Sequence, residues 1–182
     1  MEAQRPTAVG EAAHAIIGAL AGQMSHLPRQ MVTAEAFRVG AEHLRGTAPV
    51  SRRQAILFEA CGFAAAYLRC YIPPPPWTLH AVEMLVHRTD GSGRVDVAWK
   101  HPRRGYLLDE IKTCRIGTTY AVQTWIDQAA SYVTASLDAR LVGVRLLVLG
   151  ALNTSMFIPP DLGVIPLVGS AGDPERLESG TK

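Results

Sequence analysis

The chain lacks the composition signals that by themselves define a function. Its 182 residues include three cysteines, Cys61, Cys70 and Cys114, which are too few and too scattered for a disulfide framework or a CxxC pair. The formal net charge is only +2, so the overall charge indicates no polyanionic partner, and only a local basic patch would. The cysteine usage favours a reducing compartment, and we therefore expect a cytoplasmic protein.

Long apolar runs and nucleotide motifs are also missing. The longest apolar windows, around AIIGALAG and AILFEACGFAAAYL, are shorter than the ~20 residues of a membrane span, and the N-terminus has no signal-peptide pattern. GxGxxG, GxxxxGK[ST] and GxSxG do not occur. His80, His87 and His101 lack the spacing of a zinc site. We therefore expect a soluble chain without a membrane partner and without nucleotide, zinc or serine-hydrolase chemistry.

What the sequence does contain indicates one globular domain. Hydrophobic residues make up 48% and charged residues 19%, a balance typical of a chain that buries a core. Apolar spacing predicts helices over 11–24 and 33–45, within an N-terminal helical extension of residues 1–50. The core is expected over residues 51–168, and the polar residues 169–182 are expected to form a flexible tail.

The predicted core begins with a helix. Ser51 and Gln54 have the spacing of a capping box, so a helix is expected from there to about Tyr71, where the prolines at 73–76 end it. Three strand-like segments follow, LHAVEMLVHR, RVDVAW and YLLDEIKT, and their short loops predict an antiparallel meander. A helix over about 119–137, a buried strand over 143–150 and a short edge strand in MFIPPDLGVIPLV complete an α/β fold.

Charged residues lie on two of these strands, at Asp96, Glu110 and Lys112, where strand interiors usually hold apolar residues. Glu110 and Lys112 are two apart and share a face. If the two strands pair, Asp96 lies near Glu110, and the carboxylates repel unless a cation lies between them. Mg²⁺ prefers oxygen ligands, and these two carboxylates with the backbone carbonyl of Ile111 suit it. Lys112 could then orient or deprotonate a water, or stabilise developing negative charge. The alternative is an ordinary surface ion pair.

Three further features favour a catalytic interpretation. Glu59 is the only charged residue in AILFEACGFAAAYL, and a buried lone carboxylate is costly without a partner. It either pairs with a core arginine or lies at the helix rim, or it serves as a metal-site or water-binding carboxylate. Gln128 and Tyr132 lie four apart on one helix face and could reach the same site or a DNA phosphate, with Gln123 as a rival candidate.

The third feature is local positive charge. Seven Lys or Arg residues stand between His87 and Arg115, against four acids. If most of those acids face a metal or the core, the exposed surface is basic, as phosphate-backbone binding requires. The candidate DNA-binding residues are Arg94, Arg103, Arg104 and Arg115. A solvated surface of mixed charge is the alternative for the loop arginines.

In their order and spacing these motifs resemble the PD-(D/E)xK nuclease superfamily, specifically its RecB-like branch, which includes the CRISPR-associated adaptation nucleases. The segments GRVD (93–96), EIK (110–112) and QAASY (128–132) match that branch's GxxD, (D/E)xK and QxxxY patterns, and the match covers roughly residues 51–150. Two features depart from the family. Three cysteines cannot build the iron–sulfur cluster of many members, and Val95 replaces the proline before the aspartate.

The resemblance implies a restriction-endonuclease-like αβββαβ core, with a central mixed sheet flanked by helices. It implies that Asp96 and Glu110 bind Mg²⁺ or Mn²⁺, that Lys112 is catalytic, and that Gln128 and Tyr132 support the site. Glu59 would be the acid that the first core helix often supplies.

The expected function is a metal-dependent nuclease that hydrolyses DNA phosphodiester bonds with metal-activated water. Two alternatives stay open at this point. One is a noncatalytic DNA-binding module, and the other is a subunit active only in a larger assembly, with a homo-oligomer or protein partner bound through the N-terminal helices. The type of cut, the strandedness and the choice of DNA over RNA are not determined by these motifs.

Overall fold

The computed structural model describes residues 7–24, 29–114, 119–150, 153–160 and 165–167. Three helices come first: α1 (Ala8–Leu20), α2 (Arg29–Thr47) and α3 (Val50–Cys70), with the 3₁₀ helix η1 (Ala21–Gln23) after α1. Three strands follow: β1 (Thr78–Arg88), β2 (Gly91–His101) and β3 (Gly105–Cys114). The chain continues with α4 (Thr119–Ser131), the 3₁₀ helix η2 (Tyr132–Thr134), and the strands β4 (Leu141–Gly150), β5 (Thr154–Ile158) and β6 (Ile165–Leu167).

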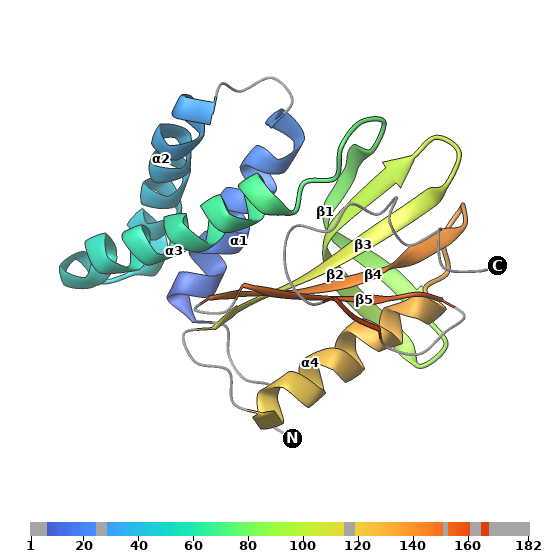
Figure 1. Ribbon diagram of the computed structural model, residues 1–182. Helices are drawn as coiled ribbons and strands as arrows, with labels where there is room; N and C mark the ends of the chain where they lie inside the picture. The colour runs from blue at the N-terminus through green and yellow to red at the C-terminus, as the bar shows by residue number, and fades with distance from the viewer. Residues whose placement is uncertain (1–6, 25–28, 115–118, 151–152, 161–164, 168–182) are drawn as a thin grey trace.

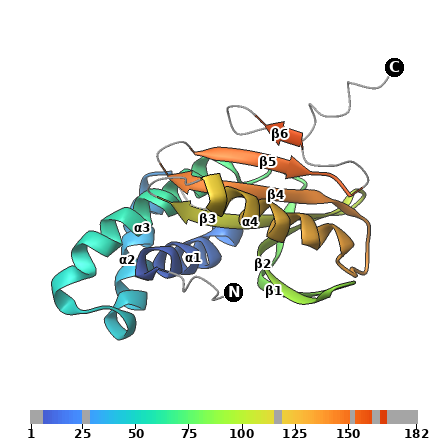
Figure 2. The same ribbon diagram turned by 90° about the horizontal axis from the view of Figure 1, so that it is seen from below.

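The strands form one mixed sheet in the order β1-β2-β3-β4-β5-β6 (Figure 2). The first three strands are antiparallel neighbours, as the meander prediction requires. β4 pairs with β3 in parallel. Parallel neighbours need a long connection, and the segment that contains α4 supplies it. Figure 1 shows α1, α2 and α3 on one side of the sheet and α4 on the other. The predicted α/β class, with a mixed sheet flanked by helices, is therefore confirmed.

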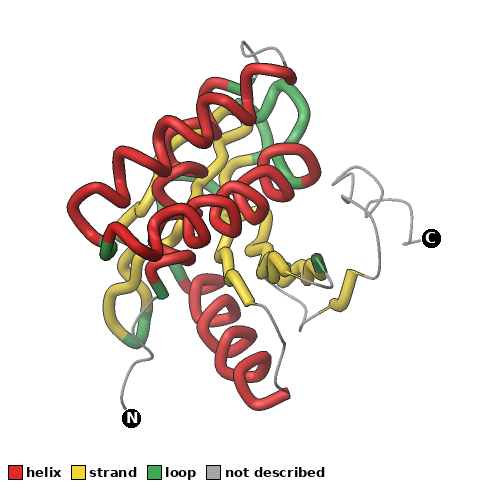
Figure 3. The backbone as a smooth tube through the Cα atoms, turned by 90° about the vertical axis from the view of Figure 1, so that its left-hand side faces the viewer, coloured by secondary structure: helices red, strands yellow, loops and turns green. Residues whose placement is uncertain are grey.

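Two hydrophobic cores lie on the two faces of the sheet. Ile16 and Ile17 of α1 pack with Leu107 and Ile111 in the core beneath the first three helices. The other core includes Tyr132 and strand residues beneath α4. Figure 3 looks onto the helices that cover the first face. The N-terminal helix α1 thus supplies part of the main core and lies directly on the sheet.

Local boundaries differ from the sequence predictions in two places. The capping box is wrong: α3 begins at Val50 with Pro49 as its N-cap residue, and no side chain caps it. The Arg52 N–H donates to the Pro49 carbonyl at 3.0 Å, so Ser51 already lies inside the helix. The last predicted helix ends early, since α4 stops at Ser131. The Ser136 N–H then donates to the His87 carbonyl at 2.7 Å, and this bridge to β1 draws the chain away from the helical path.

The other predicted elements lie close to their expected places. α1 begins three residues before the predicted start, capped by Thr7, whose hydroxyl accepts from the Gly10 N–H at 3.1 Å. Within the described ranges, the helices are too short or too polar to cross a membrane. The predicted tail over 169–182 lies outside the described residues.

Candidate metal and catalytic site

Asp96 lies in a fork where β2 and β3 separate. The hydrogen-bonded ladder between these strands ends at the pair Val97 and Asp109. Continued pairing would place Val95 opposite Ile111, but the Ile111 N–H instead donates to Asp96 Oδ2 at 2.6 Å. The Asp96 carboxylate therefore accepts a hydrogen bond that a backbone carbonyl of β2 would accept in a regular ladder. This bond holds the carboxylate beside β3.

Glu110 is buried next to this fork. Lys112 Nζ donates to Glu110 Oε1 at 2.6 Å, whereas Oε2 is buried and has no hydrogen-bond partner among the described residues. Burial, and then the charge of Asp96, raise the pKa of Glu110 to about 7, although Lys112 opposes the shift. A buried carboxylate oxygen without a partner is costly, so the site fits a cation that this oxygen would bind.

Gln128 and Tyr132 reach the same place from the α4 side. Lys112 Nζ donates to Gln128 Oε1 at 2.9 Å, and the Tyr132 hydroxyl donates to the Arg94 carbonyl at 2.6 Å. A longer contact of 3.4 Å joins Gln128 Nε2 to the Tyr132 hydroxyl. These contacts form one chain from Glu110 through Lys112 and Gln128 to Tyr132. The three sequence motifs therefore meet in space.

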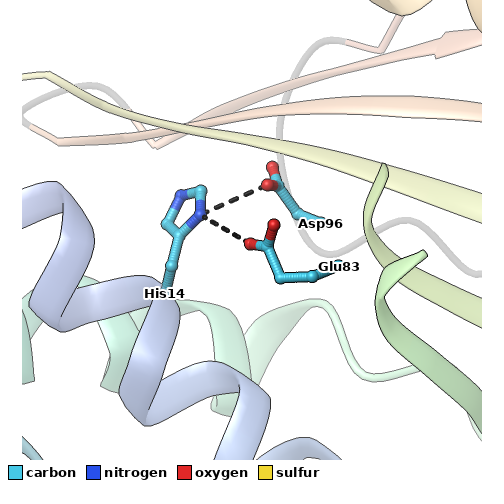
Figure 4. A group of neighbouring side chains, drawn as sticks. All are labelled: His14, Glu83 and Asp96. Carbon is cyan, nitrogen blue, oxygen red and sulfur yellow. Dashed lines mark ion pairs between the residues drawn. The ribbon is translucent and has the colours of Figure 1, made fainter. Parts of the chain in front are cut away.

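His14 approaches Asp96 from the opposite side, on α1 (Figure 4). Its Nδ1 lies 3.2 Å from Asp96 Oδ1 and 3.8 Å from Glu83 Oε1 on β1. Burial alone lowers the pKa of His14, but hydrogen bonds to the two carboxylates and their charges outweigh burial and raise it to about 10. One donor atom of each of the three residues lies within 4.8 Å of the others. A metal ion could therefore replace the histidine proton here.

The sequence analysis did not identify His14 or Glu83. One available signal was the small residues Gly10 and Gly18, which stand four residues before and after His14 and therefore share its helix face. A Cβ on Gly18 would lie 3.1 Å from Val82 Cγ1, and one on Gly10 would lie 3.0 Å from Thr113 Oγ1. These glycines let α1 approach the sheet closely, which brings His14 to the carboxylates.

The structure does not bring Glu59 into this group. Glu59 is half-buried on α3, whereas the donor atoms that lie close enough together to hold a metal ion, among the described residues, belong to His14, Glu83 and Asp96. Ile111 contributes its N–H to Asp96, and its side chain is buried in the core beneath α1. The rival Gln123 hydrogen-bonds to Asp127 at 2.8 Å in an exposed position.

The candidate DNA-binding arginines lie in different places. Arg94 is two-thirds exposed, and its Nη1 lies 3.8 Å from Glu83 Oε2 beside the site. The backbone N–H groups of Arg103 and Arg104 donate to His101 Nδ1 in the turn after β2. That turn begins five strand residues beyond Asp96, about 17 Å at the usual rise. Arg115 lies outside the described residues.

Comparison with models of known protein families finds no match for this chain, and comparison with curated proteins finds none. The geometry of the fold and the site therefore carries the functional argument.

Proposed function

We propose that this chain is a metal-dependent nuclease of the RecB-like branch of the PD-(D/E)xK superfamily, which hydrolyses DNA phosphodiester bonds. The observation that carries the proposal is Asp96 in the fork of β2 and β3, with Glu110 and Lys112 beside it on β3. The succession α3, β1, β2, β3, α4 and β4 supports a restriction-endonuclease-like αβββαβ core. The cytoplasmic location and the DNA substrate belong to the same proposal.

The donor set of the site fits a divalent cation. Asp96, Glu110 and the backbone carbonyl of Ile111 are candidate oxygen ligands for Mg²⁺ or Mn²⁺, and His14 adds a nitrogen donor near Asp96. The buried, unpartnered Oε2 of Glu110 is the atom that most needs such a partner. When bound, the ion supplies an acidified water and polarises a phosphoryl oxygen.

The protein side chains have separate roles around that ion. Lys112, held by Glu110 and Gln128, places an ammonium group where negative charge develops on the scissile phosphate. Tyr132 and Gln128 orient Lys112 and tie the helix to the strand that carries Asp96. Arg94 is exposed beside the site and can contact the DNA backbone there.

A cleavage assay tests the proposal directly. Labelled linear, circular and single-stranded DNA is incubated with purified protein in Mg²⁺, Mn²⁺ or EDTA, beside Glu110→Gln and the matched control Glu42→Gln, an exposed acid on α2. We expect cutting that needs metal, is lost in Glu110→Gln and persists in Glu42→Gln. Cutting that survives EDTA or Glu110→Gln contradicts the proposal, and circular DNA separates endonuclease from exonuclease.

A second candidate function is a noncatalytic or partner-dependent DNA-binding subunit. The observation that favours it is the exposed apolar side chains of Met31, Val50 and Phe58 on α2 and α3, because such residues often mark a partner surface. Metal-dependent DNA binding without cutting by the isolated chain is the result that would favour this candidate.

A further inference from the structure

Glu83 has an unusual backbone conformation at the edge of the site. Its φ is +51°, in the left-handed region that a residue with a side chain rarely adopts. The pairs on either side of it are Val82 with Val97 and Met84 with Val95. Glu83 therefore stands directly opposite Asp96, the residue in the fork.

The side chains on the two sides of Glu83 point to opposite faces of the sheet. Val82 packs against the core beneath α1, whereas Met84 packs against the core beneath α4. Residues two apart share a face in a regular strand, so β1 turns over at Glu83. In the resulting arrangement the Glu83 carboxylate points toward His14 on α1 (Figure 4).

The oxygens of the two carboxylates are divided between different partners. Glu83 Oε1 lies 3.8 Å from His14 Nδ1, and Glu83 Oε2 lies 3.8 Å from Arg94 Nη1. Asp96 Oδ1 faces His14 at 3.2 Å, whereas Asp96 Oδ2 accepts from the Ile111 N–H. One oxygen of each acid therefore converges with the imidazole.

We propose that Glu83 is a metal ligand and that, with His14 and Asp96, it makes this side of the site prefer a divalent transition-metal ion over Mg²⁺. This inference rests on the metal site of the proposed nuclease. Mg²⁺ binds oxygen donors and gives up its waters reluctantly, whereas an imidazole nitrogen beside two carboxylates suits transition metals better. A carboxylate supplied by β1 was not expected from the sequence motifs.

A neighbouring group gives independent support for a cation here. Glu110 is 2% exposed, and its Oε2 makes no hydrogen bond within the described residues. Glu110 directly precedes Ile111, whose N–H donates to Asp96 Oδ2 at 2.6 Å, so Glu110 lies next to the group along β3. A cation beside Asp96 would offset the negative charge on both sides of the fork.

Mn²⁺ binding to the full chain in the absence of DNA tests the inference. Free Mn²⁺ is measured by electron paramagnetic resonance, and Mg²⁺ affinity is measured by competition. We expect the wild type to bind Mn²⁺ more tightly than Mg²⁺. We expect Glu83→Gln to weaken Mn²⁺ binding at least tenfold and Mg²⁺ binding much less, while Glu42→Gln behaves as the wild type.

Glu83→Asn is a second variant in case the first does not fold, because asparagine tolerates a left-handed backbone. Unchanged Mn²⁺ affinity in a folded Glu83 variant overturns the inference. Equal Mn²⁺ and Mg²⁺ affinity in the wild type overturns it too. Mn²⁺ binding through Glu83 without DNA cleavage would count against the proposed nuclease alone, whereas cleavage with unchanged metal binding in Glu83→Gln would count against this inference alone.

Discussion

Among single residues, Lys112 is held most closely by its neighbours in the candidate site. Its ammonium group is shared between Glu110 and Gln128, and only about a fifth of the side chain is exposed. A lysine placed between a buried acid and an amide is held in one orientation, which is what stabilisation of a developing charge requires.

We expect Lys112→Met to reduce DNA cleavage by about 100-fold or more, the usual loss when one stabilising donor is removed from an active site. Folding and metal binding should persist, because the methionine keeps most of the apolar stem. Cleavage rates at saturating Mn²⁺, with circular dichroism as the folding check, measure this. Lys100→Met is the control, because Lys100 donates to Tyr106 and Asp138, which lie outside the candidate site. Full activity in Lys112→Met would rule out the proposed role.

The raised pKa of Glu110 predicts a pH dependence of stability in EDTA. Its pKa rises from 4.5 in the unfolded chain to about 7 in the fold, so its stabilising contribution is complete below pH 4.5 and is lost as the pH rises to 7. The loss is on the order of 3 kcal/mol at most. Urea unfolding at pH 4.5 and pH 7 measures it. The free energy of unfolding of Glu110→Gln should fall less between these two pH values than that of the wild type. An equal fall in both proteins would show that Glu110 is not the group responsible.

At the scale of elements, the glycine of the GRVD motif has a packing role. A Cβ on Gly93 would lie 2.8 Å from Tyr132 Cε1 and 2.9 Å from Arg88 Nη1. Gly93 therefore provides the space in which Tyr132 reaches the Arg94 carbonyl. The contact couples η2 to β2, and through Gln128 it couples both to Lys112.

We expect Gly93→Ala to lower the free energy of unfolding by about 1–3 kcal/mol, because the new methyl group overpacks the site. It should also reduce cleavage, since Tyr132 must move. The matched control is Gly62→Ala on α3, where nothing lies within 4 Å of the added Cβ. That change should raise stability by about 0.5–1 kcal/mol. Urea unfolding and cleavage rates measured together test both, and normal activity in Gly93→Ala would contradict the packing argument.

At the scale of the whole molecule, a buried ion pair joins the helical layer to the sheet. Arg145 on β4 donates to both oxygens of Asp109 at 2.7 Å, and its Nη2 also donates to the Tyr71 carbonyl at 2.8 Å. The Tyr67 hydroxyl and Trp99 Nε1 donate to Asp109 Oδ2 at 2.6 and 2.9 Å. Because Asp109 precedes Glu110, this network also holds β3 in place beside the site.

Removing one partner of this pair should be far more damaging than removing both. We expect Arg145→Met to cost about 3–5 kcal/mol, because it leaves Asp109 as an uncompensated buried charge. The double variant Arg145→Met with Asp109→Leu should recover part of that loss. Urea unfolding of the two single variants and the double variant measures the coupling, and additive losses would show that the pair is not a unit.

Much of the element order was predictable because it depends on local patterns. Apolar spacing predicted the helices, and short loops predicted the meander of β1, β2 and β3, since neighbouring residues determine both. The strand at 143–150 was expected to be fully buried, and most of it is, including Arg145 at 9% exposed, whereas Val148 and Gly150 are only partly buried. Its partner Asp109 was not predicted, because the pairing joins residues 36 positions apart.

Local sequence patterns were enough to predict that Asp96, Glu110 and Lys112 stand on neighbouring strands and that Gln128 and Tyr132 lie four residues apart on one helix face. The folded arrangement was needed to place His14 and Glu83 beside Asp96, in a group that does not include Glu59. These residues are remote in the chain: Gly10 and Gly18 allow α1 to approach the sheet, but the place where α1 packs and the reversed face of β1 at Glu83 depend on contacts between distant segments.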